Sequence, residues 1–427
     1  MKENNFGVKS RERNRKLSSV ESRLLYLAVF LFYGCAGVPL QRDLIYKNDL
    51  ENIKKAIASG ANVNAKYPGG VTPLMEASFR NYADVCKLLI KSGADVNASD
   101  SDGFTALMAA CSNNARDAAK ILISNGSKVE SADSLTGKTP LFIAVFKNFT
   151  GVAELLMENA ASVNATCNGG VTPLMSACYA DAVEAAEVLL RNGADINVKD
   201  DMGDTALVYA VLGNALKTAE MLIKSGADIN GVYGGGKTCL CVAASKNLVN
   251  MTKFLVDNGA DIVKINKDGL SALGAAVKFG SPDTAEYLLS RGQSADAKFN
   301  GLSLLMMAVN NNDSRMIKLL IENMADVNVV DSGGAGALVY AINAGNIETV
   351  KTLINLGADI NSAAANGWTP LMTAVAANFY EAVRVLLESG AELNAKNNEG
   401  LPALALAKFK RNDKVIFLLK TAGAREY

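Results

Sequence analysis

One arrangement of apolar and small residues recurs along most of this chain of 427 residues. Each copy begins at a glycine and carries leucine four residues later, alanine seven residues later and leucine nineteen residues later. The glycines are Gly70, Gly103, Gly137, Gly170, Gly203, Gly236, Gly269, Gly301, Gly334, Gly367 and Gly400, spaced 32 to 34 residues apart. Such a period is typical of repeat proteins, whose units pack only on their neighbours. We interpret the two leucines and the alanine as core residues, because only buried positions constrain side-chain size this tightly.

Each copy predicts two helices joined by a turn. In the first copy, Thr72 can cap a helix that starts at Pro73, where the missing N–H of proline costs nothing. The leucine and alanine of that helix are three residues apart and share one face. A second helix over 83–90 has apolar residues at helical spacing and ends before Gly93, where glycine supplies a left-handed stop. The polar residues 94–97 then form the turn into the next copy.

These motifs resemble the ankyrin repeat. The first copy reads Gly-Val-Thr-Pro-Leu-Met-Glu-Ala at 70–77 and Leu-Leu-Ile-Lys-Ser-Gly-Ala-Asp-Val-Asn at 88–97. The stretch Gly-Val-Thr-Pro-Leu-Met recurs at 170–175, and the resemblance covers residues 44–427. It implies an all-α ankyrin-repeat solenoid of about eleven helix-turn-helix units with short β-turn connections.

The resemblance also implies a domain organisation. Residues 1–41 form a basic head with an apolar segment, and residues 42–69 form an N-terminal half repeat that serves as a cap. Ten repeats span 70–399, and a truncated repeat with a charged surface closes the array over 400–427.

The chain departs from the ankyrin pattern at several places. The family usually has histidine after Thr-Pro-Leu, where it ties neighbouring loops by hydrogen bonds, but this chain has residues such as Met75 and Cys241. We therefore expect apolar filling instead of that polar tie. Two seams, meaning junctions between neighbouring repeats, are predicted to open more readily than the others. Residues 293–296 lack the Gly-Ala-Asp motif, and Gly336 stands where other repeats have a capping hydroxyl.

The first forty residues resemble a targeting signal. Seven basic and three acidic side chains lie within residues 1–23, and residues 24–34 carry no charge. A positive region followed by a short apolar region and small residues is typical of a secretory signal. The small residue before Cys35 is similar to a bacterial lipoprotein signal, which makes Cys35 a lipidation candidate. An uncleaved membrane anchor over 24–41 and a buried helix are the alternatives.

These features predict export or attachment to a membrane. If the segment is not a signal, the protein is cytoplasmic. The six other cysteines are in some tension with export into an oxidising space, where thiols tend to form disulfides.

Composition excludes several classes of chemistry. The chain has no histidine, so no Ser-His-Asp triad, Cys-His pair or His-containing metal site can form. Its 43 basic and 43 acidic side chains cancel, which argues against a nucleic-acid surface. The seven scattered cysteines make no Cys-x-x-Cys pair, and we interpret those in the repeats as buried apolar residues. We expect no cofactor, no metal and no enzymatic activity.

One stretch matches a phosphate-binding motif. Gly231–Thr238 satisfies GxxxxGK[ST], in which backbone N–H groups surround phosphate and Lys237 would contact it. The motif requires a buried strand before it and an acidic residue after a later apolar strand, and neither is predicted here. Gly236 and Thr238 are also the expected repeat glycine and capping threonine. A nucleotide-binding enzyme is therefore the weaker alternative.

We expect a partner protein to bind the loop tips and the first helices, because the ankyrin resemblance implies that surface. The matching positions vary while the core positions do not, and several are apolar where water is expected. The candidate contact residues are Val71, Phe79, Phe104, Phe146, Val171, Tyr179, Leu270, Leu302 and Trp368. The predicted function is that of a monomeric scaffold for protein–protein interaction; a self-associating structural spacer is another alternative.

Overall fold

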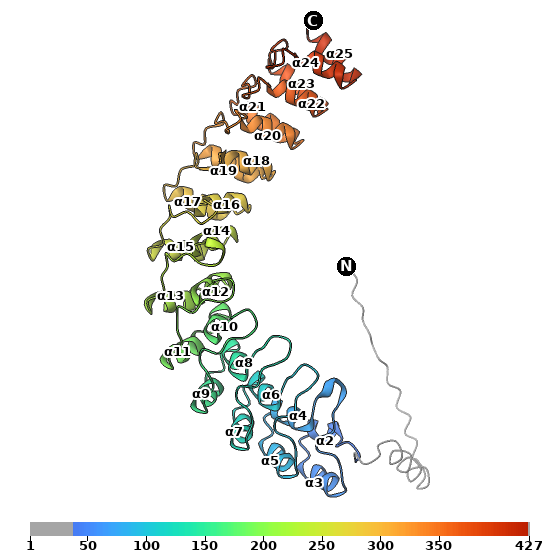
Figure 1. Ribbon diagram of the computed structural model, residues 1–427, viewed down its shortest axis with the longest axis vertical. Coiled ribbons are helices and arrows are strands. Elements are labelled where there is room, and N and C mark those ends of the chain that lie inside the picture. Colours follow the sequence, from blue (N-terminus) through green and yellow to red (C-terminus); the bar gives the residue numbers. More distant parts are fainter. Residues whose placement is uncertain (1–36, 426–427) are drawn as a thin grey trace, which may run out of the picture. The chain divides into compact units, whose positions relative to one another are not determined.

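The computed structural model describes residues 37–425, which form short helices joined by turns. It consists of two compact units, one ending at Asn168 and one beginning at Gly169. Within each unit the helices come in pairs, and the first helices of neighbouring pairs pack on one another, as most second helices also do (Figure 1). Each unit is therefore a stack of helix-turn-helix repeats, which confirms the predicted all-α class.

The first unit contains four helix pairs. The first helices are α2 (Arg42–Tyr46), α4 (Pro73–Phe79), α6 (Ala106–Ser112) and α8 (Pro140–Phe146). The second helices are α3 (Leu50–Ala58), α5 (Ala83–Lys91), α7 (Arg116–Ser124) and α9 (Thr150–Glu158), and the turn η2 is Pro68–Gly70. The N-terminal cap thus has two helices, and it begins before residue 42, because Asn62 pairs with the backbone of Val38 and Leu40.

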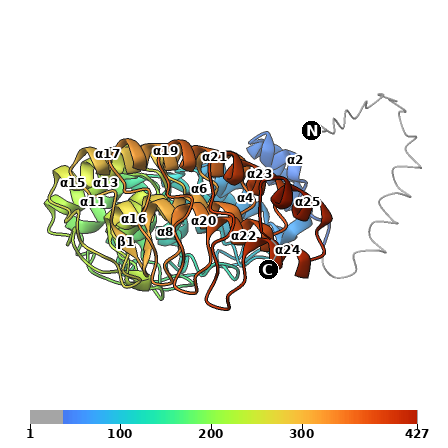
Figure 2. The ribbon, with the colours of Figure 1, turned by 90° about the horizontal axis from the view of Figure 1, so that it is seen from above.

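The second unit contains eight helix pairs. The first helices are α10 (Pro173–Tyr179), α12 (Ala206–Leu212), α14 (Cys239–Ser245), α16 (Ala272–Lys278), α18 (Leu304–Asn310), α20 (Ala337–Asn343), α22 (Pro370–Ala376) and α24 (Ala403–Phe409). The second helices are α11 (Val183–Arg191), α13 (Leu216–Lys224), α15 (Val249–Asp257), α17 (Pro282–Ser290), α19 (Ser314–Glu322), α21 (Ile347–Asn355), α23 (Tyr380–Glu388) and α25 (Asp413–Thr421). Figure 2 shows α17, α19 and α21 of this unit in one row.

Short β-type turns connect the pairs, as predicted. The strands β1 (Lys298–Phe299) and β2 (Leu302–Ser303) form an antiparallel hairpin, and η3 (Gly234–Gly236) is a single 3₁₀ turn. The equivalent loops are closed by isolated antiparallel bridges, as between Ser99 and Thr105.

The three recurring positions form the core, as the sequence predicted. The alanines from Ala77 to Ala407 and the later leucines from Leu89 to Leu419 are 0% exposed in every repeat, and the earlier leucines, Leu74 to Leu404, are at most 3% exposed. The small alanine lets neighbouring first helices approach closely. Burial of each leucine side chain stabilises the folded repeats by about 2 kcal/mol.

Hydrogen bonds from asparagine side chains couple each repeat to the next. The turn between the two helices of a pair contains a left-handed residue, such as Asn81 at φ 56° and Asn247 at φ 55°. Asparagine tolerates this conformation, and its side chain accepts a hydrogen bond from the first turn of the next second helix. The Oδ1 atoms of Asn81 and Asn247 accept from the backbone N–H groups of Ala118 and Thr284, each at 3.0 Å.

A second set of asparagines couples the loops that follow the second helices. The side chain of Asn328 donates to the carbonyl of Gly357 at 3.1 Å and accepts from the N–H of Asp359 at 2.8 Å. The same pattern joins Asn230 to Gly259 and Asp261. These bonds satisfy backbone groups in the loops directly after α21 and α15, where the helices themselves leave them unpaired.

Hydrogen bonds remain at both of the seams that were expected to be weak. Asp296 takes the place of the bridging asparagine and accepts from the N–H of Asp326 at 2.7 Å. The cap of α20 is missing at Gly336, as predicted. However, Asp331 accepts hydrogen bonds from the N–H of Ala335 and the hydroxyl of Tyr340, which holds the turn before α20 in place.

The expectation of apolar filling at the usual histidine position is only partly correct. Met75 packs in the core, but its sulfur also accepts a hydrogen bond from the N–H of Thr72 at 3.3 Å, and the Thr72 hydroxyl accepts from the N–H of Met75. The thiol of Cys241 donates to the carbonyl of Leu270 in the next repeat at 3.6 Å. Sulfur can accept and donate weak hydrogen bonds, so it supplies part of the tie that histidine would supply.

Candidate functional site

Aromatic side chains are exposed where several first helices end. Phe79 and Phe146 are the last residues of α4 and α8 in the first unit, and Tyr179 ends α10 in the second. Phe409 is exposed at the end of α24, and Phe279 is exposed directly after the last residue of α16. Each helix stops there because a left-handed residue follows two positions after its last residue, and this turn leaves the aromatic ring on the surface.

Three of the predicted contact residues share one hollow in the first unit. Val71, Phe79 and Phe104 line a depression of about 320 Å³ together with Arg42 and Tyr46. The residues come from α2, from α4 and from the loops before α4 and α6. The hollow therefore combines an apolar wall with a wall of guanidinium and phenol groups.

A buried carboxylate organises the charged wall. Glu76 is buried on α4, and Arg42 and Arg80 bind its two oxygens at 2.7 and 2.9 Å. Burial by itself raises the pKa of Glu76, but the hydrogen bonds from Arg42 and Arg80 outweigh that effect and leave the pKa below its ordinary value. The guanidinium carbon of Arg80 lies 4.1 Å from the ring centroid of Tyr46. This cluster fastens the cap helix α2 to α4 and fixes the position of both guanidinium groups.

Another predicted residue, Trp368, lines a hollow in the second unit. The depression has a volume of about 700 Å³, and small residues such as Ala335, Ala364 and Ala376 form most of its lining. No charged side chain lines it. A half-buried indole beside small uncharged residues offers a surface for an uncharged apolar group.

The remaining predicted residues differ in exposure. Val171 and Leu302 are half-buried in the loops before α10 and α18. Leu270 is only 2% exposed, so the expectation that it contacts a partner is wrong. The reason is Gly274 in α16, where other repeats carry a larger side chain. A Cβ atom on Gly274 would lie 3.0 Å from Leu270 Cδ2, so Leu270 occupies the space that Gly274 leaves.

Several exposed apolar residues in the loops were not predicted. In the second unit Val232, Val263, Ile265 and Met202 are exposed, and Leu135 is exposed in the first unit. The available signal was an apolar residue inside a turn that is otherwise polar. These residues lie outside the fixed offsets from each glycine at which the ankyrin resemblance places contacts.

The loop that matches a phosphate-binding motif is a repeat turn. No strand precedes it among the described residues, and Thr238 caps α14 by accepting from the N–H of Cys241 at 3.2 Å. The N–H of Gly234 donates to the carboxylate of Asp204 at 2.9 Å, and the N–H of Gly236 donates to the Tyr233 carbonyl. These N–H groups are used within the protein, and Asp204 places negative charge where a phosphate would need positive charge.

The cysteines of the described chain do not form a reactive cluster. Cys86, Cys111, Cys178, Cys239 and Cys241 are buried, and Cys167 is half-buried. Burial raises the pKa of the Cys86 thiol to about 11, which keeps it protonated at neutral pH. Residues 37–425 contain no group of three or more cysteine, aspartate and glutamate side chains arranged to hold a metal ion.

The predicted targeting segment is largely outside the region that the structure covers. Residues 24–34 and the lipidation candidate Cys35 lie outside the described residues. Within residues 37–425, no helix combines the length and the apolar character that crossing a bilayer requires.

Comparison with known families identifies the repeats directly. The family model described as Ankyrin repeats (3 copies) matches residues 43–133, 231–299, 289–364, 305–397 and 362–425. A model described as Ankyrin repeats (many copies) matches residues 155–210, and a single Ankyrin repeat model matches 136–168 and 202–232. No curated protein matches the chain. Since the family matches cover nearly all of residues 43–425, this chain belongs to the ankyrin-repeat family.

Proposed function

We propose that this chain is a non-enzymatic scaffold that binds another protein on the exposed side of its first helices and the adjoining loops. The observation that carries the proposal is that aromatic residues are exposed at the ends of first helices in each unit, Phe79 and Phe146 in the first and Tyr179 in the second. Exposed aromatic side chains cost free energy in water and are the residues most often found as anchors in protein interfaces.

The two hollows suggest how a partner is held. In the first unit, a partner can place an apolar side chain against Phe79 and Phe104 while a polar or acidic group meets the guanidinium groups of Arg42 and Arg80. In the second unit, the uncharged hollow at Trp368 accepts a purely apolar group. Because the core fixes both backbones, little conformational entropy is lost on binding.

The proposal is tested by affinity capture with the whole chain. Phe79→Ser combined with Phe146→Ser removes two exposed anchors without touching the core. Phe417→Ser is the control, because Phe417 is also an exposed phenylalanine but lies on the second helix α25. We expect a captured protein to be lost from the double variant and retained by the control. If both variants retain the same proteins, the exposed side of the first helices is not the binding surface.

Two other functions make different predictions. A self-associating spacer would capture only further copies of itself and would sediment as an oligomer, whereas we propose a monomer. A nucleotide-dependent enzyme would bind nucleotide in a manner abolished by Lys237→Ala. The hydrogen bond from Gly234 to Asp204 disfavours that second alternative.

We also propose that residues 1–35 direct export or attach the protein to a membrane. The support is the sequence alone: a basic head, the uncharged stretch 24–34 and small residues around Cys35. Mass spectrometry of the protein from its native cell would show a lipidated Cys35 at the new N-terminus, or cleavage nearby. An intact N-terminus in the soluble cytoplasmic fraction would contradict the proposal.

A further inference from the structure

Three departures from the repeat pattern fall at one interface, between the second helices α19 and α21. The position eighteen residues after each repeat glycine is aliphatic or aromatic in ten of eleven repeats, and Thr352 is the exception. Four positions further, Leu356 is the one large apolar residue where the other repeats have serine, asparagine, arginine or alanine. The next position is glycine in nine repeats and alanine in one, but it is methionine at Met324.

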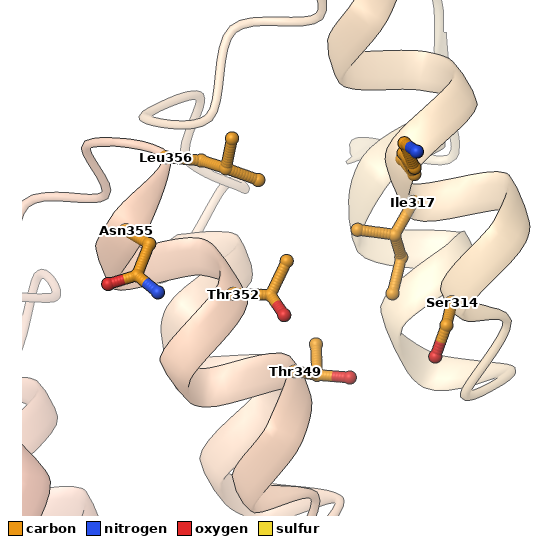
Figure 3. Close-up of a pocket in the computed structure, with 7 residues that line it drawn as sticks. Ser314, Ile317, Thr349, Thr352, Asn355 and Leu356 are labelled. Atoms are coloured by element: carbon orange, nitrogen blue, oxygen red, sulfur yellow. The ribbon is translucent and has the colours of Figure 1, made fainter.

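The small side chain of Thr352 leaves a hollow between these helices. The depression has a volume of about 400 Å³. Thr349 and Thr352 of α21, and Leu356 directly after that helix, point across it toward Ile317 of α19 (Figure 3). Ile317 and Thr349 are buried and form its floor, whereas Leu356 is 44% exposed at its edge. The hollow is thus apolar at the bottom and carries an exposed aliphatic side chain at its rim.

The packing of α19 against α21 is consistent with a side chain at Thr352 that is too small to fill the interface. The contacts between α19 and α21 are sparser than those of α17 with α19 or of α21 with α23. In the next repeat, the position equivalent to Thr352 is the buried Val385. The Thr352 hydroxyl donates to the Glu348 carbonyl of its own helix at 2.8 Å, so the side chain adds only a methyl group to the interface. The α13–α15 interface is equally sparse, but there the equivalent residue is the large, half-buried Phe254.

Met324, in the turn that follows α19, has a strained backbone conformation. It has a left-handed backbone with φ 67°, which glycine adopts in most other repeats, and its side chain is 84% exposed. It lies in the turn before Asn328, whose side chain binds Gly357, directly after Leu356. A large residue in a strained conformation that contributes little to the core is typical of a functional surface.

We propose that the groove between α19 and α21 is a second docking site, which binds an amphipathic helix of a partner protein through an aliphatic anchor and a neighbouring carboxylate. At the equivalent position the other repeats carry an apolar side chain of their own, so the hollow is complementary to an aliphatic group supplied from outside. The only charged side chain that lines the hollow is that of Lys318, which is 75% exposed and whose ammonium group lies 3.7 Å from Glu322. An acidic residue one turn from the anchor would meet it.

A helix suits this groove because its walls are themselves two helices. A partner helix laid between them can direct side chains three or four residues apart into the groove. The site lies on the second helices and is separate from the surface of the first helices proposed above. The two proposals can therefore fail independently.

Binding of designed peptides to the whole chain tests the inference. The probes are fluorescein-labelled amphipathic helices of about 15 residues. One peptide carries leucine anchors flanked by glutamate, the second has lysine in place of glutamate, and the third has alanine in place of leucine. We expect the leucine–glutamate peptide to bind saturably and the other two to bind at least about tenfold more weakly, a change of about 1.4 kcal/mol.

Variants of the protein locate the site. Thr352→Leu fills the hollow and is expected to weaken binding of the leucine–glutamate peptide by about tenfold or more. Lys318→Glu is expected to reverse the preference toward the lysine peptide. Arg384→Glu is the matched control, because Arg384 occupies the same position two repeats later and also pairs with a glutamate four residues on. Phe79→Ser with Phe146→Ser should leave peptide binding unchanged.

Several results would overturn the inference. The first is that the leucine–glutamate peptide does not bind saturably. The second is that it binds Thr352→Leu as tightly as the wild type. The third is that Arg384→Glu weakens its binding as much as Lys318→Glu does. A dimer of the wild-type chain that Thr352→Leu dissociates would identify a second copy as the occupant instead. Saturable binding of octanoate that Thr352→Leu abolishes, without binding of any peptide, would identify a site for a small amphiphile instead.

Discussion

The side chain of Asn328 offers the sharpest test of how neighbouring repeats are coupled. It donates to the Gly357 carbonyl and accepts from the Asp359 N–H, at 3.1 and 2.8 Å. Replacing it by alanine removes both bonds. Each such bond contributes about 0.5–1.5 kcal/mol net, and water can partly replace them at this exposed site, so we expect a loss of about 1–2 kcal/mol.

The chain itself suggests a graded version of this experiment. Asp296 occupies the equivalent position and keeps only the acceptor bond, to the N–H of Asp326. Asn328→Asp should therefore retain the bond from Asp359 and lose the bond to Gly357. We expect it to cost about half as much as Asn328→Ala, or about 0.5–1 kcal/mol.

Native-state hydrogen exchange is the appropriate assay, because repeat arrays open locally and one global unfolding free energy is not well defined for them. The amide of Asp359 should exchange about 5–30 times faster in Asn328→Ala than in the wild type. Asn310→Ala, an exposed asparagine that ends α18, is the control. The reasoning is refuted if Asp359 exchanges at the same rate in Asn328→Ala and in the control. Equal losses in the alanine and aspartate variants would show that the acceptor bond contributes nothing.

The remaining predictions concern other joints of the stack. Val263 occupies the position of the bridging asparagines Asn230 and Asn328, so Val263→Asn should add the same two loop bonds to the next repeat. Hydrogen exchange in residues 290–296 should then slow by an amount corresponding to about 1 kcal/mol; unchanged exchange would contradict this. Gly336→Ser should cap α20 and stabilise it by up to about 1 kcal/mol, and Gly336→Ala should stabilise it less. The hydrogen-exchange rate of the Val339 amide measures both effects. Because the pKa of Glu76 is lowered in the folded state, its contribution is fully present above its unfolded value of about 4.5 and is lost as the pH falls below it. Exchange in α2 should therefore accelerate below that pH in the wild type, and this acid-dependent step should be absent from Glu76→Gln.

Much of the fold could be predicted because the repeat presents the same evidence many times. The leucines and the alanine at fixed offsets are buried in every repeat, since each sits at the same place in an identical stack. Exposed aromatic residues such as Phe79 and Tyr179 could also be predicted, because they stand at positions where the pattern is free to vary. Where one residue replaces another within the repeat, the sequence was a weaker guide. The thioether of Met75 and the carboxylate of Asp296 both make hydrogen bonds that a residue-type argument does not anticipate.

The sequence by itself determined the period, the helix pairs, the capping residues and the core, because these depend on local propensity and on a spacing that repeats. The tertiary structure alone decided what depends on the neighbour of each residue. Leu270 is buried because Gly274 in the following helix leaves a space that its side chain fills. The hollow beside Thr352 exists because α19 and α21 do not close over it. The physical reason is that burial is a property of the gap between two repeats, and no single repeat specifies the side chains on both sides of that gap.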